Sequence, residues 1–352
     1  MENPVVFAEM SPQRLDAILG KMDPARIGLI GDVCLDVYWH ADMRKSELSR
    51  ETPHFPLPIV HERMSPGAGG NVVANLAALQ PATLKVISVI GQDWRGTELI
   101  RLFSGLGLDT SDILAVPHQT TNAYIKPLRA GISDLVYEDP RLDFANYTPI
   151  GEAVENELID KLNRAAACLD VLCVSDQMRS GVITGRIRDQ ICKLADEGLR
   201  VLVDSRDHIG LFHGVMLKPN EVEGARAVGA RAVGAYPASL HGMIDLAATA
   251  RQLAQQNSGP VFMTIGALGA LHTDSGRVTH IPAPAVEGPI DICGAGDSFL
   301  AGLALALAAG ADACEAALIG NLCSSVTIRQ IGTTGTATRE QIRMAAQGHM
   351  AG

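Results

Sequence analysis

The sequence is poor in aromatic side chains and in positive charge. Phe, Trp and Tyr together make up 4% of the 352 residues, and 29 Lys and Arg face 39 Asp and Glu, for a formal net charge of −10. A surface that binds nucleic acid combines clustered basic side chains with aromatic stacking, so this composition argues against one. An acidic chain is also poorly suited to an anionic membrane surface. We therefore expect neither nucleic acid nor a membrane as a partner.

Several signatures of other protein classes are missing. The seven cysteines are an odd number and contain no C-x-x-C pair, which is typical of free thiols in a reducing compartment. No apolar run reaches membrane-spanning length without a charge, and residues 1–14 lack the apolar core of a signal peptide. The absence of G-x-x-x-x-G-K-[ST] excludes a P-loop nucleotide site. We expect a cytoplasmic protein.

The most informative segment that is present is Asp291-Ile-Cys-Gly-Ala-Gly-Asp297, which opens into the apolar stretch Ser298–Ala309. A glycine turn before such a stretch predicts a buried helix, whose first N–H groups, at Gly294–Gly296, have no helical partner and attract anions. Asp297 places a carboxylate beside them, where it can serve as the base for an attacking hydroxyl in phosphoryl transfer. The alternative is a plain acid at a helix N-terminus.

From Val154 onward, predicted helices alternate with predicted strands. The strands 171–175, 200–204 and 215–218 are separated by helical segments, which is typical of a parallel, doubly wound α/β sheet. In such sheets, ligands bind beyond the carboxyl ends of the strands. Four polar residues follow predicted strands and are expected at that edge, namely Asp32, Asp176, Asp204 and Asn220.

Two stretches depart from this alternation. Residues 38–61 combine many charges with a proline-rich run from Pro53 to Pro58, and proline confines strands to sheet edges. The stretch 121–136 predicts more short strands. We interpret both as excursions from the main sheet.

Further motifs are weak when taken singly. Asp32 and Asp36 could accept hydrogen bonds from a polyol. The alternative is that Asp32 caps a turn and Asp36 is solvated. The turn 67–71 offers backbone donors and the Asn71 amide, or is simply a close-packed glycine turn. Asn220 and Glu223 could organise Mg²⁺, form a helix capping box, or do both.

Another weak motif is the turn Thr264-Ile-Gly-Ala-Leu-Gly269, between two predicted strands. Its backbone could pass close to the phosphates of a nucleotide, and a hairpin with two glycines is the alternative.

The order of these motifs, from about Ile27 to about Ile342, resembles that of the ribokinase-like (PfkB) family of carbohydrate kinases. The resemblance implies one three-layer α/β/α domain over residues 1–352, doubly wound on a mostly parallel sheet. It also implies a small β-sheet lid over the sugar, formed by the excursions at about 38–61 and 119–140. ATP and Mg²⁺ are the implied cofactors, and a monovalent cation is left open.

The resemblance also assigns roles to residues. It implies that Asp297 is the general base and that the anion hole is formed by Gly294, Ala295 and Gly296. It implies that the sugar is held by Asp32, Asp36, Gly67, Gly69, Gly70, Asn71, Asp176 and Arg179. It implies that the ATP site is lined by Asn220, Thr264, Gly266, Gly269 and Asn321. It also implies that Asn220 and Glu223 organise Mg²⁺ and its waters.

Two positions depart from the family pattern. Ala68 stands where the sugar-binding turn commonly has its second glycine, and Cys293 replaces a hydroxyl residue before the anion hole. We interpret Cys293 as a buried packing thiol rather than a nucleophile.

Within the family, the sequence is similar to the heptose 7-phosphate kinases, in Asp32–Trp39, Glu51–Val60, Arg141–Phe144 and Ile331–Thr336. A phosphorylated sugar needs cations in its pocket. The candidates near the predicted rim are Arg44, Lys45, Arg50 and Arg179. A nucleoside kinase and a non-catalytic sugar or nucleotide sensor of the same fold remain the alternative functions.

The lid also predicts an assembly. Apolar edge strands are usually covered, so we expect a homodimer with Phe55, Leu57 and Ile59 at or near the contact. A tandem repeat, residues 225–229 and 230–234, is expected at a surface helix end and is given no function.

Overall fold

The computed structural model describes residues 4–7, 10–230, 240–274 and 276–350. The strands are β1 (Val5–Val6), β2 (Arg26–Gly31), β3 (Val33–Asp42), β4 (Ile59–Ala68), β5 (Thr83–Gly91), β6 (Ile113–Val116), β7 (Ala123–Ala130), β8 (Tyr137–Glu138), β9 (Leu142–Phe144), β10 (Val171–Asp176), β11 (Arg200–Ser205), β12 (Met216–Leu217), β13 (Val261–Thr264), β14 (Ala270–Asp274) and β15 (Arg277–Ile281). The helices are α1 (Pro12–Gly20), α2 (Gly69–Ala78), α3 (Trp94–Gly105), α4 (Glu152–Ala166), α5 (Gly185–Asp196), α6 (Glu221–Ala227), α7 (Leu240–Asn257), α8 (Ala295–Ala308), α9 (Ala313–Thr327) and α10 (Arg339–Met350). Short 3-10 helices are η1 (Met43–Lys45), η2 (Ile209–Leu211) and η3 (Gly266–Leu268).

The main sheet has ten strands in the order β1-β15-β14-β13-β12-β11-β10-β2-β5-β6. The pairs from β13 through β12, β11, β10, β2 and β5 to β6 are all parallel, while β13–β14 and β14–β15 are antiparallel. The sheet is therefore mostly parallel, as the alternation of elements predicts.

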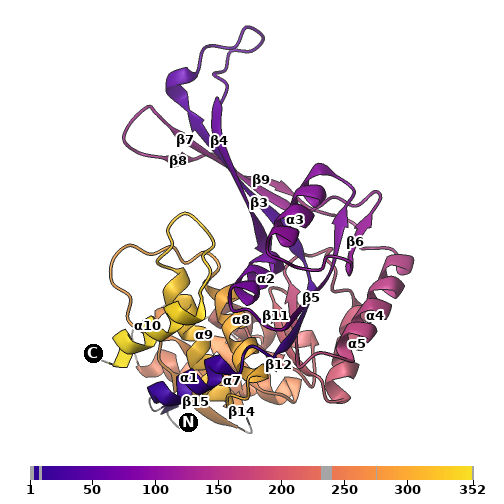
Figure 1. Cartoon of the computed structure of the whole chain (residues 1–352), viewed down its shortest axis with the longest axis vertical. Coiled ribbons are helices and arrows are strands. Elements are labelled where there is room, and N and C mark those ends of the chain that lie inside the picture. Colours follow the sequence, from indigo (N-terminus) through magenta and orange to yellow (C-terminus); the bar gives the residue numbers. More distant parts are fainter. Residues whose placement is uncertain (1–3, 8–9, 231–239, 275, 351–352) are drawn as a thin grey trace.

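Side chains alternate between the two faces of this sheet and form two separate cores. On β10, Val171 and Cys173 join the core that α1, α2, α3, α8, α9 and α10 cover, whereas Leu172 and Val174 join the core under α4, α5 and α7. This two-residue period is that of a strand buried on both faces. The predicted three-layer α/β/α arrangement is confirmed (Figure 1).

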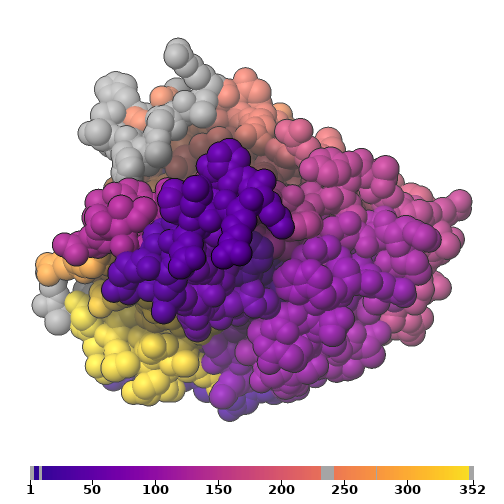
Figure 2. Space-filling model, turned by 90° about the horizontal axis from the view of Figure 1, so that it is seen from above, coloured from indigo at the N-terminus to yellow at the C-terminus, as the bar shows by residue number. Residues whose placement is uncertain are grey.

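A second sheet projects from the main body and forms the lid (Figure 1). Its strand order is β4-β3-β7-β8, and β9 pairs with β7. Figure 2 views the molecule from the lid side, and the indigo and violet lid strands stand out toward the viewer. The proline-rich residues 53–58 form no strand and lie in the loop between β3 and β4. The central strand of the lid is β3, which begins at Val33, one residue after β2 ends.

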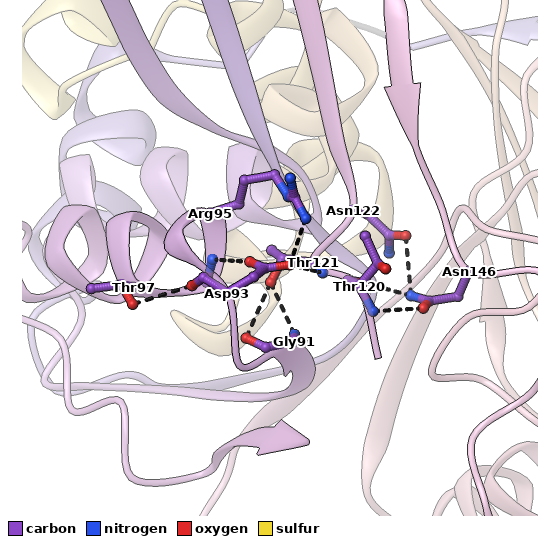
Figure 3. Close-up of polar contacts among 9 residues, drawn as sticks. Gly91, Asp93, Arg95, Thr97, Thr120, Thr121, Asn122 and Asn146 are labelled. Atoms are coloured by element: carbon purple, nitrogen blue, oxygen red, sulfur yellow. Dashed lines mark hydrogen bonds and ion pairs between the residues drawn. The ribbon is translucent and has the colours of Figure 1, made fainter. Parts of the chain in front are cut away.

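A buried polar network attaches β7 of the lid to the main body (Figure 3). The Asp93 carboxylate accepts from the Thr121 N–H at 3.0 Å and from Arg95 Nη2 at 2.7 Å, and it also caps α3. The Thr121 hydroxyl bonds to the Gly91 backbone. The Arg95 guanidinium lies 4.3 Å from the ring centroid of Phe144 on β9. The residues just before β7 are thus fixed to the ends of β5 and α3.

Two further expectations concern local structure. The first copy of the tandem repeat lies at the end of α6, as expected, and Gly229 there has a left-handed φ of 67°. Most of the second copy, from residue 231, lies outside the described residues. Within the described ranges, no helix is both long and apolar enough to cross a lipid bilayer.

Candidate active site

The N-terminus of α8 forms the centre of the candidate site. Gly294 precedes the helix with φ 79° and ψ 5°, a left-handed conformation that favours glycine, and no side chain caps the helix. The Ala295 N–H donates to the Ile292 carbonyl at 3.2 Å. Because the end is uncapped and carries the helix dipole, it can stabilise negative charge.

Asp297 lies in the first turn of α8 and is half-buried. Burial is the main cause that raises its pKa to about 7, and the nearby Asp204 carboxylate adds to this rise, whereas Lys218 and a hydrogen bond from Asn71 oppose it. Asn71 Nδ2 lies 3.2 Å from Asp297 Oδ2. A carboxylate with a pKa near neutrality is suited to take up a proton during a reaction.

Lys218 and Asp204 form a buried ion pair, of which the sequence pointed only to Asp204 at the ligand-binding edge of the sheet. Lys218 Nζ lies 3.1 Å from Asp204 Oδ2, and Lys218 is 3% exposed. A Cβ atom built on Gly296 would lie 3.5 Å from Lys218 Nζ, so the ammonium group is close to the start of α8. The available signal was a lysine as the last residue of the predicted strand 215–218, where a buried cation needs a partner.

Asp32 holds the loop that follows β10. Its carboxylate accepts from the backbone N–H groups of Gln177 and Met178 at 2.8 Å and of Val182 at 2.7 Å. Burial nevertheless raises the pKa of Asp32 to about 6. Arg179 lies on this loop and is exposed. Asp32 therefore supports the loop that carries Arg179, and this role does not depend on a contact between Asp32 and a sugar.

Asp176 ends β10 and bonds to the loop after β11. Its Oδ2 accepts from the Ser205 hydroxyl at 2.6 Å and lies 3.0 Å from His208 Nδ1. Burial raises the pKa of Asp176, and these two bonds oppose the rise. Asp32, Asp176 and Asp204 thus gather at one edge of the sheet, as their positions after strands predict.

Asp36 lies on β3 of the lid and is only 5% exposed. Its pKa is raised by burial and lowered by the positive charges of Lys126, Arg141 and Arg63. Lys126 also donates to the Tyr38 hydroxyl at 3.1 Å. The sequence motifs did not point to these three cations, because each is brought near Asp36 only by strand pairing within the lid sheet or by the folding of the chain around that sheet.

Of the four cations that the sequence predicted near the rim of the sugar pocket, only Arg179 lies at the carboxyl edge of the main sheet. Arg44 and Lys45 belong to η1, and Arg50 follows in the loop at the far end of the lid, away from the main sheet (Figure 1). Arg44 forms an ion pair with Asp42 at 2.8 Å. The expectation that Arg44, Lys45 and Arg50 lie near the rim is therefore wrong, because β3 and β4 extend farther from the body than their sequence spacing suggested.

The turn between β4 and α2 packs closely against the site. Side chains at Gly67, Gly69 or Gly70 would collide with Asp36, with the Asp32 carbonyl or with Pro66, respectively. These glycines therefore allow the backbone to approach both acids. Ala68 between them has φ 49° and ψ −130°, a conformation that only glycine adopts without strain.

The nucleotide side of the site begins at α6. Asn220 Oδ1 accepts from the N–H groups of Val222 and Glu223, and Glu223 Oε2 accepts from the Asn220 N–H at 2.8 Å, so the capping box is present. Burial and the Asp204 carboxylate raise the pKa of Glu223.

The turn from Thr264 to Gly269 joins the antiparallel strands β13 and β14 through η3. Gly266 has φ 59° and open space where a Cβ would stand, whereas a Cβ on Gly269 would lie 2.2 Å from the Ile281 carbonyl oxygen. Asn321 on α9 is buried and donates to the Ile281 and Pro282 carbonyls at 3.0 and 3.3 Å. In this structure Gly269 and Asn321 shape the neighbouring loop, and Gly266 faces open space.

The residues fit a magnesium ion that is held mainly by phosphates and water. Among the described residues, no group of three or more His, Cys, Asp or Glu side chains could hold a metal ion. Glu223 uses only Oε2 in the capping box, so Oε1 can bind a water of the ion. Mg²⁺ usually keeps several waters and takes few protein ligands, which matches this arrangement.

Cys293 is exposed, and so the interpretation of it as a buried packing residue is wrong. The turn leaves the main core before α8 begins, and Ile292 beside it is 74% exposed.

Comparison with known proteins agrees with this geometry. The sequence pattern described as pfkB family carbohydrate kinase matches residues 61–339. The chain belongs to this family. Members of the pfkB family transfer a phosphoryl group from ATP, typically with Mg²⁺, to a sugar.

Curated relatives include the bifunctional protein HldE of Geobacter metallireducens, which is 32% identical over 320 residues, or 89% of this chain and 61% of that protein. HldE of Geotalea uraniireducens is 29% identical over 346 residues, covering 97% of this chain and 67% of that protein. This chain thus spans about three fifths to two thirds of the length of these relatives.

Solved structures share the fold of this pfkB family member. Phosphofructokinase-2 from Escherichia coli in complex with fructose-6-phosphate has a TM-score of 0.69 at 18% identity, covering 93% of this chain and 99% of that one. Ribokinase from Thermotoga maritima has a TM-score of 0.65 at 19% identity, covering 92% and 99%.

Proposed function

We propose that this chain phosphorylates a hydroxyl group of a sugar phosphate with ATP, using Asp297 as the general base. The observation that carries the proposal is the position of the Asp297 carboxyl group, with a pKa of about 7, at the uncapped start of α8 and within 3.2 Å of Asn71 Nδ2. The base and the donors for negative charge thus lie within one helical turn, which is what phosphoryl transfer requires.

In the proposed mechanism Asp297 takes the proton of the attacking hydroxyl as its oxygen bonds to the γ-phosphorus, and the bond to ADP breaks. Asn71 Nδ2 holds Asp297 Oδ2 in position. The backbone N–H groups of Gly294, Ala295 and Gly296 stabilise the charge on the transferred group. The Ala295 N–H must then leave its 3.2 Å contact with Ile292 or share its hydrogen.

Lys218 supplies fixed positive charge next to this turn. Its ion pair with Asp204 and the nearby Glu223 and Asp297 raise the pKa of Lys218 despite burial, so the ammonium form persists at neutral pH. Mg²⁺, when bound, supplies further positive charge to the phosphates. Asn220 and Glu223 would hold its waters, and Thr264, Gly266, Gly269 and Asn321 would line ATP, the last two by shaping the loop.

The sugar is proposed to lie between the lid and the carboxyl edge of the main sheet. Asp36, Asn71 and the turn of Gly67, Gly69 and Gly70 line the lid side. Asp32 and Asp176 lie on the opposite side and position the loops of Arg179 and His208.

The substrate is proposed to carry a phosphate already. The positive charges of a cation cluster, Lys126, Arg63 and Arg141, lower the pKa of Asp36. Arg63 is bonded to residues 332–333 and Arg141 to Asp143, which leaves Lys126 as the member of the cluster that would bind a phosphate. The likeness to heptose 7-phosphate kinases and the relatives named HldE point to a heptose 7-phosphate.

The proposal is tested by following ADP formation over a panel of neutral sugars, sugar phosphates and nucleosides. We expect turnover with a sugar phosphate, and with heptose 7-phosphate in particular. Turnover only with nucleosides would make the chain a nucleoside kinase of the same fold. Binding without ADP formation on any substrate would make it a sensor. The retained base and donors argue against a sensor, whereas they are equally compatible with a nucleoside kinase, which only the assay separates from a sugar kinase. Repeating the assay with K⁺ replaced by choline tests activation by a monovalent cation.

Arg179 is proposed to contact the phosphate of the substrate. Arg179→Ala should raise KM for the sugar phosphate about tenfold or more, the effect of losing a charged hydrogen bond, and leave KM for ATP nearly unchanged. Lys126→Met is the parallel variant, because Lys126 lies within the cation cluster at Asp36. A sugar-phosphate KM unaffected by Arg179→Ala but raised by Lys126→Met would move the phosphate to the lid cations.

A homodimer through the lid is also proposed. Phe55, Leu57 and Ile59 are 60%, 37% and 43% exposed, on or next to the edge strand β4. An edge strand with exposed apolar side chains is a surface that proteins usually cover.

A further inference from the structure

Arg63 connects the lid to the C-terminal part of the chain. It lies on β4, the edge strand of the lid, opposite Tyr38 on β3. Its guanidinium group lies 3.9 Å from the centroid of the Tyr38 ring, a cation–π contact that limits the directions in which the side chain can extend.

From this position the guanidinium group donates to the loop between α9 and α10. Arg63 Nη1 lies 3.0 Å from the Thr333 hydroxyl, and Nη2 donates to the Gly332 carbonyl. Figures 1 and 2 show the yellow C-terminal region next to the base of the lid. Because Nη1 and Nη2 lie in the fixed plane of the guanidinium group, this contact defines both the distance and the orientation between β4 and the loop.

The same loop is bonded to the turn that begins α8. One Asp291 oxygen accepts from the Gly332 N–H and the other from the Cys293 N–H, each at 3.0 Å. A Cβ on Gly294 would lie 3.4 Å from the Thr334 side chain, so Thr334 is in van der Waals reach of the helix start. A continuous path of contacts therefore runs from Arg63 through residues 332–334 to Gly294.

We propose that Arg63 is a positioning residue that couples the placement of the lid to the geometry of the anion-binding turn at Gly294–Gly296. The proposal rests on the function proposed above. When the lid lies over the sugar, the two bonds of Arg63 hold residues 332–333, and Asp291 passes this constraint to the turn. When the lid moves away, Gly332 and Thr333 lose these bonds and the turn is less constrained. Donors for the transferred phosphoryl group are thus ordered only when the sugar is covered.

The first test does not depend on turnover. Amide hydrogen exchange of residues 291–296 and 329–335 should be faster in Arg63→Met than in the wild type. The matched control is Arg129→Met, which removes a lid arginine whose ion pair with Asp139 does not involve the loop. Thr333→Val removes one acceptor from the loop side and leaves the lid intact, so it should also speed exchange. Unchanged exchange in both Arg63→Met and Thr333→Val would overturn the proposal.

The second test uses kinetics with the substrate found in the panel. Arg63→Met should lower kcat about tenfold and change KM for ATP less than about twofold, because the affected donors act on the transferred group. The double variant with Thr333→Val should be no worse than Arg63→Met alone, since both break one contact.

Two outcomes would contradict the coupling. A rise in KM for the sugar with an unchanged kcat would make Arg63 a substrate ligand, and an equal loss of kcat in Arg129→Met would reflect general damage to the lid. A wild-type chain that makes no ADP would refute the proposed function alone, because the exchange result still decides whether Arg63 orders the turn.

Discussion

At the scale of single residues, Asp297 shows how catalysis and stability oppose each other. Asp297→Asn should lower kcat by about 10²–10⁴-fold, the usual contribution of a general base, with a small effect on KM for ATP. In the wild type, kcat/KM for the sugar should fall below about pH 7, where Asp297 becomes protonated. Near-normal turnover of the variant, or a flat profile between pH 5.5 and 8, would mean that another group is the base.

The same substitution should stabilise the fold at high pH. Folding raises the pKa of Asp297 from 3.8 to about 7, so the folded state binds a proton that the unfolded state releases between these values. Stability from this group is therefore lost as the pH rises through that window. Asn mimics the neutral acid, and Lys218 keeps its partner Asp204. Calorimetry should show Asp297→Asn more stable than the wild type by about 1 kcal/mol or more at pH 8 and by little at pH 4.

Ala68 is a second residue whose local conformation conflicts with its type. Its φ of 49° and ψ of −130° are costly for any residue with a Cβ, so Ala68→Gly should stabilise the protein by about 1 kcal/mol in urea unfolding. Ala74→Gly in the interior of α2 is the matched control and should destabilise by about 1 kcal/mol. Equal destabilisation by both substitutions would show that the turn carries no strain.

At the scale of elements, the loop after β10 depends on a single acid. Asp32→Asn replaces one acceptor with a donor that faces backbone N–H groups, so unfolding in urea should show a loss of about 1–3 kcal/mol. KM for the sugar should rise, and a double variant with Arg179→Ala should add little, because Asp32 holds the loop of Arg179. Asp160→Asn, a change at an exposed acid on α4 outside the site, should change stability by less than about 0.5 kcal/mol. Fully additive effects on KM would indicate that Asp32 binds the sugar directly.

Elements with strong local signals could be predicted from the sequence. The strands β10 and β11 agree with the expected segments 171–175 and 200–204 to within one residue, because their apolar patterns are local. The capping box at Asn220 was likewise visible in four consecutive residues. The turn at Gly294 followed from its glycines.

The cation cluster could not be predicted in this way. Lys126 reaches Asp36 because β7 pairs with β3 in parallel, with Tyr124 opposite Asp36, and this register depends on the whole lid sheet. The same holds for Arg63, whose acceptors lie 269 and 270 positions farther along the chain. Long-range pairing decides which charged side chains enter the site, and the sequence motifs contain no record of it.

At the scale of the whole molecule, the lid extends far from the main body and contributes only a small core of its own, formed by Leu35, Val37, Ala123 and Ile125. A sheet with so little buried apolar area gains stability from a partner.

We therefore expect light scattering to give the mass of a dimer at micromolar concentration. Phe55→Glu combined with Ile59→Glu should give a monomer, since burying like charges without a partner is costly. Leu211→Glu, a change at an apolar residue of the main body that is 57% exposed, is the control and should remain dimeric. A wild-type monomer would refute the lid dimer, and a dimer that persists in the Phe55 and Ile59 variant would place the contact on another surface.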